Sequence, residues 1–251
     1  MEPIASAQNP RIKAWKKLQR KRERDRSGLF LVEGEHLVEE ALKSNINVKE
    51  IIVVEDRELP KEWAVTEVEV VRVTERVFQE LAETETPQGM IAVCEKPPPE
   101  NMLFESGRYL FLDRIQDPGN LGNLVRTAEA AGLQGVVFGS GCADPYNGKV
   151  VRSTQGALFY MPVQQMDLSE ALEHCRANRV PVFGTSLNGS TYSAIAPQES
   201  FALLMGNEGS GVDPSLLEQT DHNLYIPVHG RSDSLNVSVA AGILIYHLRG
   251  D

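Results

Sequence analysis

The chain has 251 residues, of which 41% are hydrophobic and 24% are charged, the composition of a globular protein with one large or two ordinary domains. No apolar run approaches the roughly 20 residues that span a bilayer, and the polar N-terminus lacks the apolar segment of a signal peptide. The three cysteines lack metal or redox spacing, so we expect a cytoplasmic protein with reduced thiols and no metal site.

The charge is unevenly distributed along the chain. The formal net charge is −10, but residues 1–28 hold nine lysines and arginines against three acidic residues. The negative net charge argues against a protein that coats nucleic acid. The basic segment 1–28 instead favours binding of a polyanion at one end of the molecule. A basic helix face that is merely solvated is the alternative.

The N-terminal part predicts a small α/β domain over residues 1–97. Ile12, Trp15 and Leu18 recur at three-residue spacing among basic residues, which predicts one basic helix over 9–26. Apolar patterning then predicts strands at 29–32, 51–54, 68–73 and 90–93, and helices at 35–43 and 75–82. Three consecutive prolines at 97–99 can continue neither a helix nor a central strand, so we expect a linker over 98–107.

Beyond the linker, strands alternate with helices and no internal repeat occurs. The expected strands are 109–112, 136–138, 180–184 and 202–205, and the expected helices are 121–131, 149–155, 168–177 and 235–248. This alternation predicts a mainly parallel sheet covered on both faces, within a second domain over 108–251.

The first segment with chemical potential is residues 117–128, DPGNLGNLVRTA. A strand is followed by a Pro-Gly turn, Asn120 stands where a helix cap is expected, and Arg126 follows two turns later. A purely structural arginine is the alternative at this position.

Two further segments follow predicted strands. Residues 204–212, LMGNEGSGV, hold three glycines that leave backbone groups open to a ligand, but they match neither the dinucleotide fingerprint nor a P-loop. Residues 226–230, IPVHG, lead to a helix that we expect Ser234 to cap. Because carboxyl ends of parallel strands share one edge of a sheet, we expect the three segments to form one site.

These three segments resemble the signature blocks of SpoU-type (TrmH-like) RNA ribose 2′-O-methyltransferases of the SPOUT superfamily. The resemblance runs from about Arg108 to the end of the chain, and residues 30–34, FLVEG, more loosely resemble the family's substrate-binding domain. It implies a C-terminal sheet tied into a trefoil knot, S-adenosylmethionine (SAM) as cofactor, and a homodimer formed through the C-terminal domain. The two-domain layout resembles that of members that modify ribosomal RNA.

The resemblance also implies residue roles. The polar catalytic set is Asn120, Arg126, Glu208, Ser234 and Asn236, and the cofactor-binding set is Thr185, Ser186, Leu187, Gly206, Asn207, Gly209, Ile226, Val228 and Leu235. A guanidinium stays protonated at neutral pH, so we expect Arg126 to stabilise a forming alkoxide rather than act as a base. Transfer RNA as substrate, a non-catalytic RNA-binding module and a dinucleotide-dependent enzyme are the alternatives.

Overall fold

The computed structural model describes residues 2–63, 68–98, 102, 104–231 and 233–250, and the chain divides into two compact units. Unit 1 comprises Met1–Pro98 and Asp144–Tyr160, and unit 2 comprises Pro99–Ala143 and Met161–Asp251. The first boundary, after Pro98, lies at the start of the expected linker. None of the helices in the described ranges is long and apolar enough to cross a bilayer.

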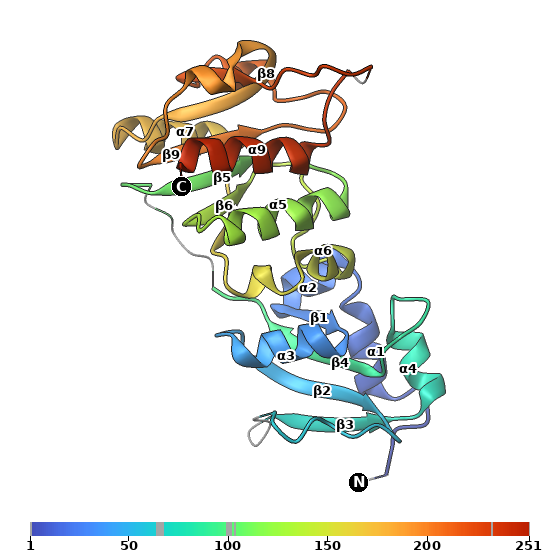
Figure 1. Ribbon diagram of the computed structural model, residues 1–251. Helices are drawn as coiled ribbons and strands as arrows, with labels where there is room; N and C mark the ends of the chain where they lie inside the picture. The colour runs from blue at the N-terminus through green and yellow to red at the C-terminus, as the bar shows by residue number, and fades with distance from the viewer. Residues whose placement is uncertain (1, 64–67, 99–101, 103, 232, 251) are drawn as a thin grey trace. The chain divides into compact units, whose positions relative to one another are not determined.

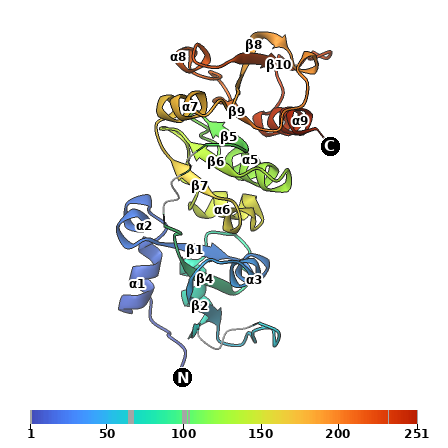
Figure 2. The same ribbon diagram turned by 90° about the vertical axis from the view of Figure 1, so that its left-hand side faces the viewer.

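Unit 1 is built on a four-stranded sheet in the order β1-β4-β2-β3, antiparallel except for the β2–β3 pair. Its strands are β1 (Leu29–Glu33), β2 (Val48–Val54), β3 (Glu69–Val73) and β4 (Met90–Glu95), and its helices are α1 (Pro10–Lys17), α2 (Lys21–Ser27), α3 (Glu35–Lys43), α4 (Glu75–Leu81), α6 (Gly148–Thr154) and the 3₁₀ turn Ala157–Phe159. Apolar residues of α1 and α4 pack on one face of the sheet, and α3 lies on the other (Figures 1 and 2).

The basic N-terminal segment forms two helices instead of the single helix expected over 9–26. Asn9 caps α1 by accepting a hydrogen bond from the Arg11 amide, and Arg20, in extended conformation, precedes α2. The break frees the carbonyl oxygen of Leu18, which accepts a 2.8 Å hydrogen bond from Nη1 of the buried Arg24. A side-chain contact between residues six positions apart thus accompanies the break, and helical periodicity alone could not indicate it.

Residues Asp144–Tyr160 pack within unit 1, although their sequence position led us to expect them in the second domain. The Asp144 carboxylate accepts hydrogen bonds from Nε and Nη2 of Arg24 at 3.0 and 2.5 Å, and both side chains are less than 10% exposed. The Tyr146 ring contacts Phe30 of β1 at a centroid distance of 4.9 Å. A buried ion pair and aromatic packing thus hold the segment against α2 and β1.

Unit 2 is built on a six-stranded, entirely parallel sheet in the order β10-β8-β9-β5-β6-β7. Its strands are β5 (Arg108–Leu112), β6 (Gly135–Phe138), β7 (Val163–Gln165), β8 (Val182–Thr191), β9 (Phe201–Met205) and β10 (His222–Tyr225), and its helices are α5 (Pro118–Ala130), α7 (Leu168–Ala177), α8 (Pro214–Leu217), α9 (Val237–Arg249) and the 3₁₀ turn Tyr192–Ala194. The expected α/β class with a parallel sheet is confirmed.

Helices cover both faces of the sheet in unit 2. Helices α5 and α9 lie side by side on one face, and α7 lies on the other (Figures 1 and 2). The central strand β9 is buried along its whole length, as expected where helices cover both faces. Strands β5, β6 and β9 end in register at Leu112, Phe138 and Met205, so the segments that follow them leave the same edge of the sheet.

Candidate active site

A cavity of about 750 Å³ opens at the carboxyl edge of the sheet in unit 2. Its walls come from the loop after β9, residues 185–187 of β8, the segment after β10 and the first turns of α9. Thirteen of the fourteen residues named from the sequence line it: Asn120, Thr185, Ser186, Leu187, Gly206, Asn207, Glu208, Gly209, Ile226, Val228, Ser234, Leu235 and Asn236. The three predicted segments and residues 185–187 of β8 therefore converge on one cavity.

The loop Gly206–Val212 folds back tightly on itself. A Cβ atom at Gly206 would lie 2.1 Å from the Val212 nitrogen, so only glycine fits there without displacing the backbone. The backbones of Asn207 and Gly211 exchange two hydrogen bonds of 3.1 and 2.9 Å. The Asn207 Oδ1 atom accepts hydrogen bonds from the Gly209 and Ser210 amides at 2.9 and 3.0 Å. These bonds leave Glu208 exposed at the tip.

A chain of polar side chains joins this loop to α5 and α9. Nδ2 of Asn120 donates to Oε1 of Glu208 at 3.1 Å, and Nδ2 of Asn236 donates to Oδ1 of Asn120 at 2.9 Å. Oδ1 of Asn236 in turn accepts from the amide and the hydroxyl of Ser238 at 2.9 and 2.6 Å. One residue from each of the three predicted segments thus takes part in a single network.

Both helix caps differ from those expected. Asp117 caps α5 and its Oδ1 accepts from the Asn120 amide at 2.8 Å, while Asn236 rather than Ser234 caps α9. Asp, Asn and Ser are all favourable caps, so the local sequence does not discriminate among them. As a result, the side chain of Asn120 is free to bond Glu208 and Asn236.

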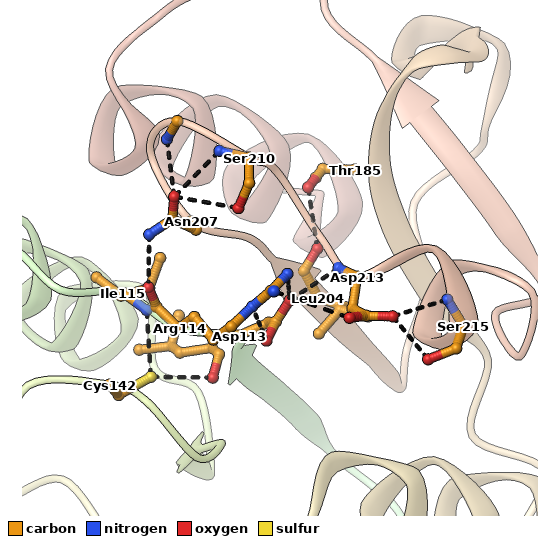
Figure 3. Close-up of polar contacts among 12 residues, drawn as sticks. Asp113, Arg114, Ile115, Cys142, Thr185, Leu204, Asn207, Ser210, Asp213 and Ser215 are labelled. Carbon is orange, nitrogen blue, oxygen red and sulfur yellow. Dashed lines mark hydrogen bonds and ion pairs between the residues drawn. The ribbon is translucent and has the colours of Figure 1, made fainter.

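The loop is also attached to the end of β5, as Figure 3 shows. Nδ2 of Asn207 donates to the Arg114 carbonyl oxygen at 2.9 Å, and the Asp213 amide donates to Oδ2 of Asp113 at 2.8 Å. The hydrogen bond from Ser215 lowers the pKa of the Asp213 carboxyl, and Asp113 raises the pKa of the Arg114 guanidinium. The sequence analysis did not identify Asp113 or Arg114 as part of the site.

Arg126 is the one of the fourteen predicted site residues that does not line the cavity. Its side chain is exposed on α5 and borders a separate hollow together with Ser238, Val239 and Tyr246. Within one chain the structure therefore does not bring Arg126 into the cavity with the other thirteen residues.

The cavity wall combines apolar surface with two negative charges. Leu187 and Leu235 are 71% and 38% exposed and border the cavity, and Leu224 and Tyr225 of β10 also line it. Among the lining residues that the structure describes, only Glu208 and Asp233 are charged. The sequence analysis missed Asp233 and β10. Nowhere in the described ranges do three or more His, Cys, Asp or Glu side chains gather as metal ligands would.

A parallel α/β sheet with a glycine-lined cavity at its carboxyl edge is typical of proteins that bind a small organic ligand at that edge. Comparison with known proteins identifies the class more closely. Residues 107–246 match the SpoU rRNA Methylase family, and residues 9–92 match the MRM3-like substrate binding domain. The chain belongs to the SpoU rRNA methylase family.

Individual relatives agree with this assignment along the whole chain. The 23S rRNA (guanosine(2553)-2′-O)-methyltransferase RlmP of Bacillus subtilis is 51% identical over 251 residues, which is 100% of both proteins. The AdoMet-bound rRNA methyltransferase of Sinorhizobium meliloti superposes with a TM-score of 0.86 at 30% identity, covering 98% of this chain and 97% of that one. The SpoU methyltransferase AviRb of Streptomyces viridochromogenes, solved in complex with AdoMet, gives 0.85 at 29% identity, covering 96% and 97%.

These findings confirm the prediction of a SAM-dependent RNA 2′-O-methyltransferase at the level of the family. They do not test the roles of individual residues, which stay predictions.

Proposed function

We propose that this protein transfers the methyl group of SAM to the ribose 2′-hydroxyl of one guanosine in 23S ribosomal RNA. The nucleotide is the one that corresponds to guanosine 2553 of the Bacillus subtilis relative. The observation that carries the proposal is the 51% identity to that enzyme along both entire chains.

The residues around the cavity fit SAM. The exposed apolar surfaces of Leu187 and Leu235 suit a heterocyclic ring, and the absence of a side chain at Gly206 lets the loop backbone close against Val212. The carboxylates of Glu208 and Asp233 suit a ligand that carries a sulfonium charge. SAM supplies an electrophilic methyl group when bound, and we propose that no metal is needed to activate it.

The polar network is suited to holding the ribose. We propose that Asn120, Asn236 and Ser234 orient the sugar and that Glu208 keeps the loop in place through its hydrogen bond from Asn120. Orientation of a nucleophile in line with the methyl group can supply a large part of the rate enhancement. We propose that the guanidinium of Arg126 stabilises the developing negative charge on the 2′-oxygen.

We propose further that the protein is a homodimer through the face formed by α5 and α9. Val239, Ile243 and Tyr246 are 53%, 36% and 49% exposed on α9, and Arg126 of α5 borders one hollow together with Val239 and Tyr246. An apolar face of this kind is typical of an interface between subunits. A second copy on this face would also bring Arg126 to the interface. A monomeric mass by light scattering at micromolar concentration would contradict the dimer.

The RNA-binding surface that we propose lies on α1 and α2 of unit 1. Arg11, Lys16, Lys21, Arg24 and Arg26 form ion pairs within the unit. In the described part of the chain, Lys13, Lys17, Arg20 and Arg22 are exposed and form no ion pair. Replacing these four by glutamine should reduce the salt dependence of RNA binding while the affinity for SAM is retained.

The family resemblance further suggests a trefoil knot in unit 2 and, with an rRNA substrate, a cytoplasmic location. Both are part of our proposal. The hydrogen bonds of Asn120 with Glu208 and with Asn236 join the three segments that such a knot would place side by side.

The test is to map 2′-O-methyl groups in 23S rRNA from cells with and without the protein, and in unmodified 23S rRNA treated with purified protein and SAM. We expect one methyl group at the nucleotide equivalent to guanosine 2553 in both experiments. Methylation of a different nucleotide or of tRNA would contradict the proposed target. Absence of SAM binding by calorimetry would instead favour a non-catalytic RNA-binding module, and binding of NAD would favour a dinucleotide-dependent enzyme.

A further inference from the structure

Two consecutive residues at the end of β5 hold both ends of the loop that forms one wall of the cavity (Figure 3). At its start, Asn207 donates through Nδ2 to the Arg114 carbonyl oxygen at 2.9 Å. Beyond its end, the Asp213 amide donates to Oδ2 of Asp113 at 2.8 Å. Neither Asp113 nor Arg114 lines the cavity, so any effect on the cofactor passes through the loop.

The Asp113 carboxylate also contacts the side chain of Arg114. Its two oxygens accept hydrogen bonds from Nε and Nη2 of Arg114 at 3.1 and 3.0 Å, a bidentate pair. Arg114 has a φ of +55°, in the left-handed region that residues other than glycine seldom adopt. This conformation directs the Arg114 carbonyl oxygen to Asn207, while the guanidinium returns to Asp113. One buried carboxylate, 4% exposed, therefore acts on both ends of the loop.

Nη1 of Arg114 also lies 3.8 Å from Oδ2 of Asp213, so the Arg114 side chain contacts the residue that follows the loop. A further polar anchor lies at the tip of the loop. The Glu208 carboxylate accepts from Nδ2 of Asn120 at 3.1 Å and from the Asp117 amide at 3.4 Å. These contacts attach its exposed tip to α5. The hydrogen bonds of Asn207 to Gly209 and Ser210 shape the turn internally, but they do not position it relative to the sheet. Apart from the direct connection of Gly206 to β9, the side-chain contacts described between the ends of the loop and the end of β5 are those of Asp113, Arg114 and Asn207.

We propose that Asp113 is a positioning residue for the cofactor: it holds the loop Gly206–Val212 in the SAM-binding conformation, directly through Asp213 and indirectly through Arg114. The inference rests on the proposed SAM cavity. A wild-type protein that fails to bind SAM would overturn the proposed function, whereas variants of a SAM-binding protein test the inference itself.

The first test is D113N, an isosteric change that removes the charge and turns an amide toward the Arg114 guanidinium. We expect the Kd for SAM by calorimetry to rise about tenfold, since loss of a hydrogen bond to a charged group has an effect of that order. Amide hydrogen exchange should accelerate at Asp213 and within the loop. RNA affinity and the rate at saturating SAM should stay within a few-fold of wild type, which general unfolding would not allow.

The matched control is D221N, which makes the same substitution at the opposite edge of the sheet. Oδ2 of Asp221 accepts from the Val182 amide at 2.7 Å, the same kind of bond that Asp113 makes to Asp213. We expect D221N to bind SAM within twofold of wild type. Equal losses in the two variants, or wild-type SAM affinity in D113N, would overturn the inference.

A second pair of variants separates the backbone of Arg114 from its side chain. Both R114A and R114G remove the guanidinium, but only glycine adopts a φ of +55° without strain. We expect R114A to raise the Kd for SAM about tenfold and R114G to recover most of that loss, because glycine can still present its carbonyl oxygen to Asn207. The side chain of Arg114 is 37% exposed, so both variants should fold. An R114G protein that binds SAM no better than R114A would contradict the role of the left-handed backbone.

Discussion

Replacement of Gly206 by alanine should weaken SAM binding about 100-fold or more while leaving the protein folded. A Cβ atom at this position would lie 2.1 Å from the Val212 nitrogen and 2.2 Å from the Gly211 carbonyl carbon, whereas ordinary contacts begin at 3.4 Å. Because both clashing atoms belong to the backbone, no side-chain rotation can relieve the overlap. The loop must move by more than an ångström.

The magnitude follows from what the displacement disrupts. Overpacking of a tight site costs about 1–3 kcal/mol. The two backbone hydrogen bonds between Asn207 and Gly211, at 3.1 and 2.9 Å, would also be strained, at about 0.5–1.5 kcal/mol each. SAM binding then requires the loop to return to its wild-type conformation. If this makes the free energy of binding about 3 kcal/mol less favourable, the Kd for SAM rises at least about 100-fold.

Isothermal titration calorimetry measures this effect, and circular dichroism checks that G206A is folded. The matched control is G230A, because Gly230 is exposed, lies outside the cavity lining and has no atom within 4 Å of the added Cβ. We expect G230A to bind SAM within twofold of wild type. If G206A binds SAM as tightly as G230A does, the close approach of the loop backbone is not required for cofactor binding and the reasoning fails.

Three further predictions concern other parts of the molecule. D144N leaves the buried Arg24 charge uncompensated and should lower the free energy of unfolding by about 3–5 kcal/mol, as measured by urea titration. A decrease of less than about 1 kcal/mol would show that water solvates the Arg24 guanidinium. R126K should reduce single-turnover methylation about 10²- to 10³-fold with SAM affinity unchanged, and a rate within a few-fold of wild type would make Arg126 structural only. Burial raises the pKa of the Cys142 thiol to about 11 and that of the Cys175 thiol to about 12. Both thiols should therefore react slowly with iodoacetamide at pH 8. Labelling of the folded protein as fast as that of the unfolded protein would contradict this prediction.

The sequence by itself determined the elements whose apolar periodicity is strong. Helices α3 and α7 have the predicted bounds of 35–43 and 168–177, because each has an amphipathic pattern and a clear start. The central strands β5 and β9 were also evident, since continuous apolar runs bounded by turn residues are typical of a parallel sheet covered on both faces. The convergence of three segments on one edge followed from that topology.

Short or edge elements were not predictable, because their stability comes from partners distant in sequence. Strand β10 lies at the edge of the sheet beside β8, and their pairing includes a register shift between Asn223 and Leu224 that no local pattern indicates. The same holds for residues Asp144–Tyr160, which the Arg24–Asp144 ion pair joins to unit 1 across 120 positions of the chain.

Within the site, the sequence determined which residue types are available, and the tertiary structure decided which of them meet. Arg126 follows Asn120 by six residues, a rotation of about 240° around α5, so the two side chains leave the helix in different directions. Asn236 caps α9 in place of Ser234, and its side chain meets Asn120 across 116 positions. Asp113 contacts the Asp213 amide across 100 positions. Local sequence patterns carry no information on contacts of this range, because they depend on how the strands and loops of unit 2 are arranged in space.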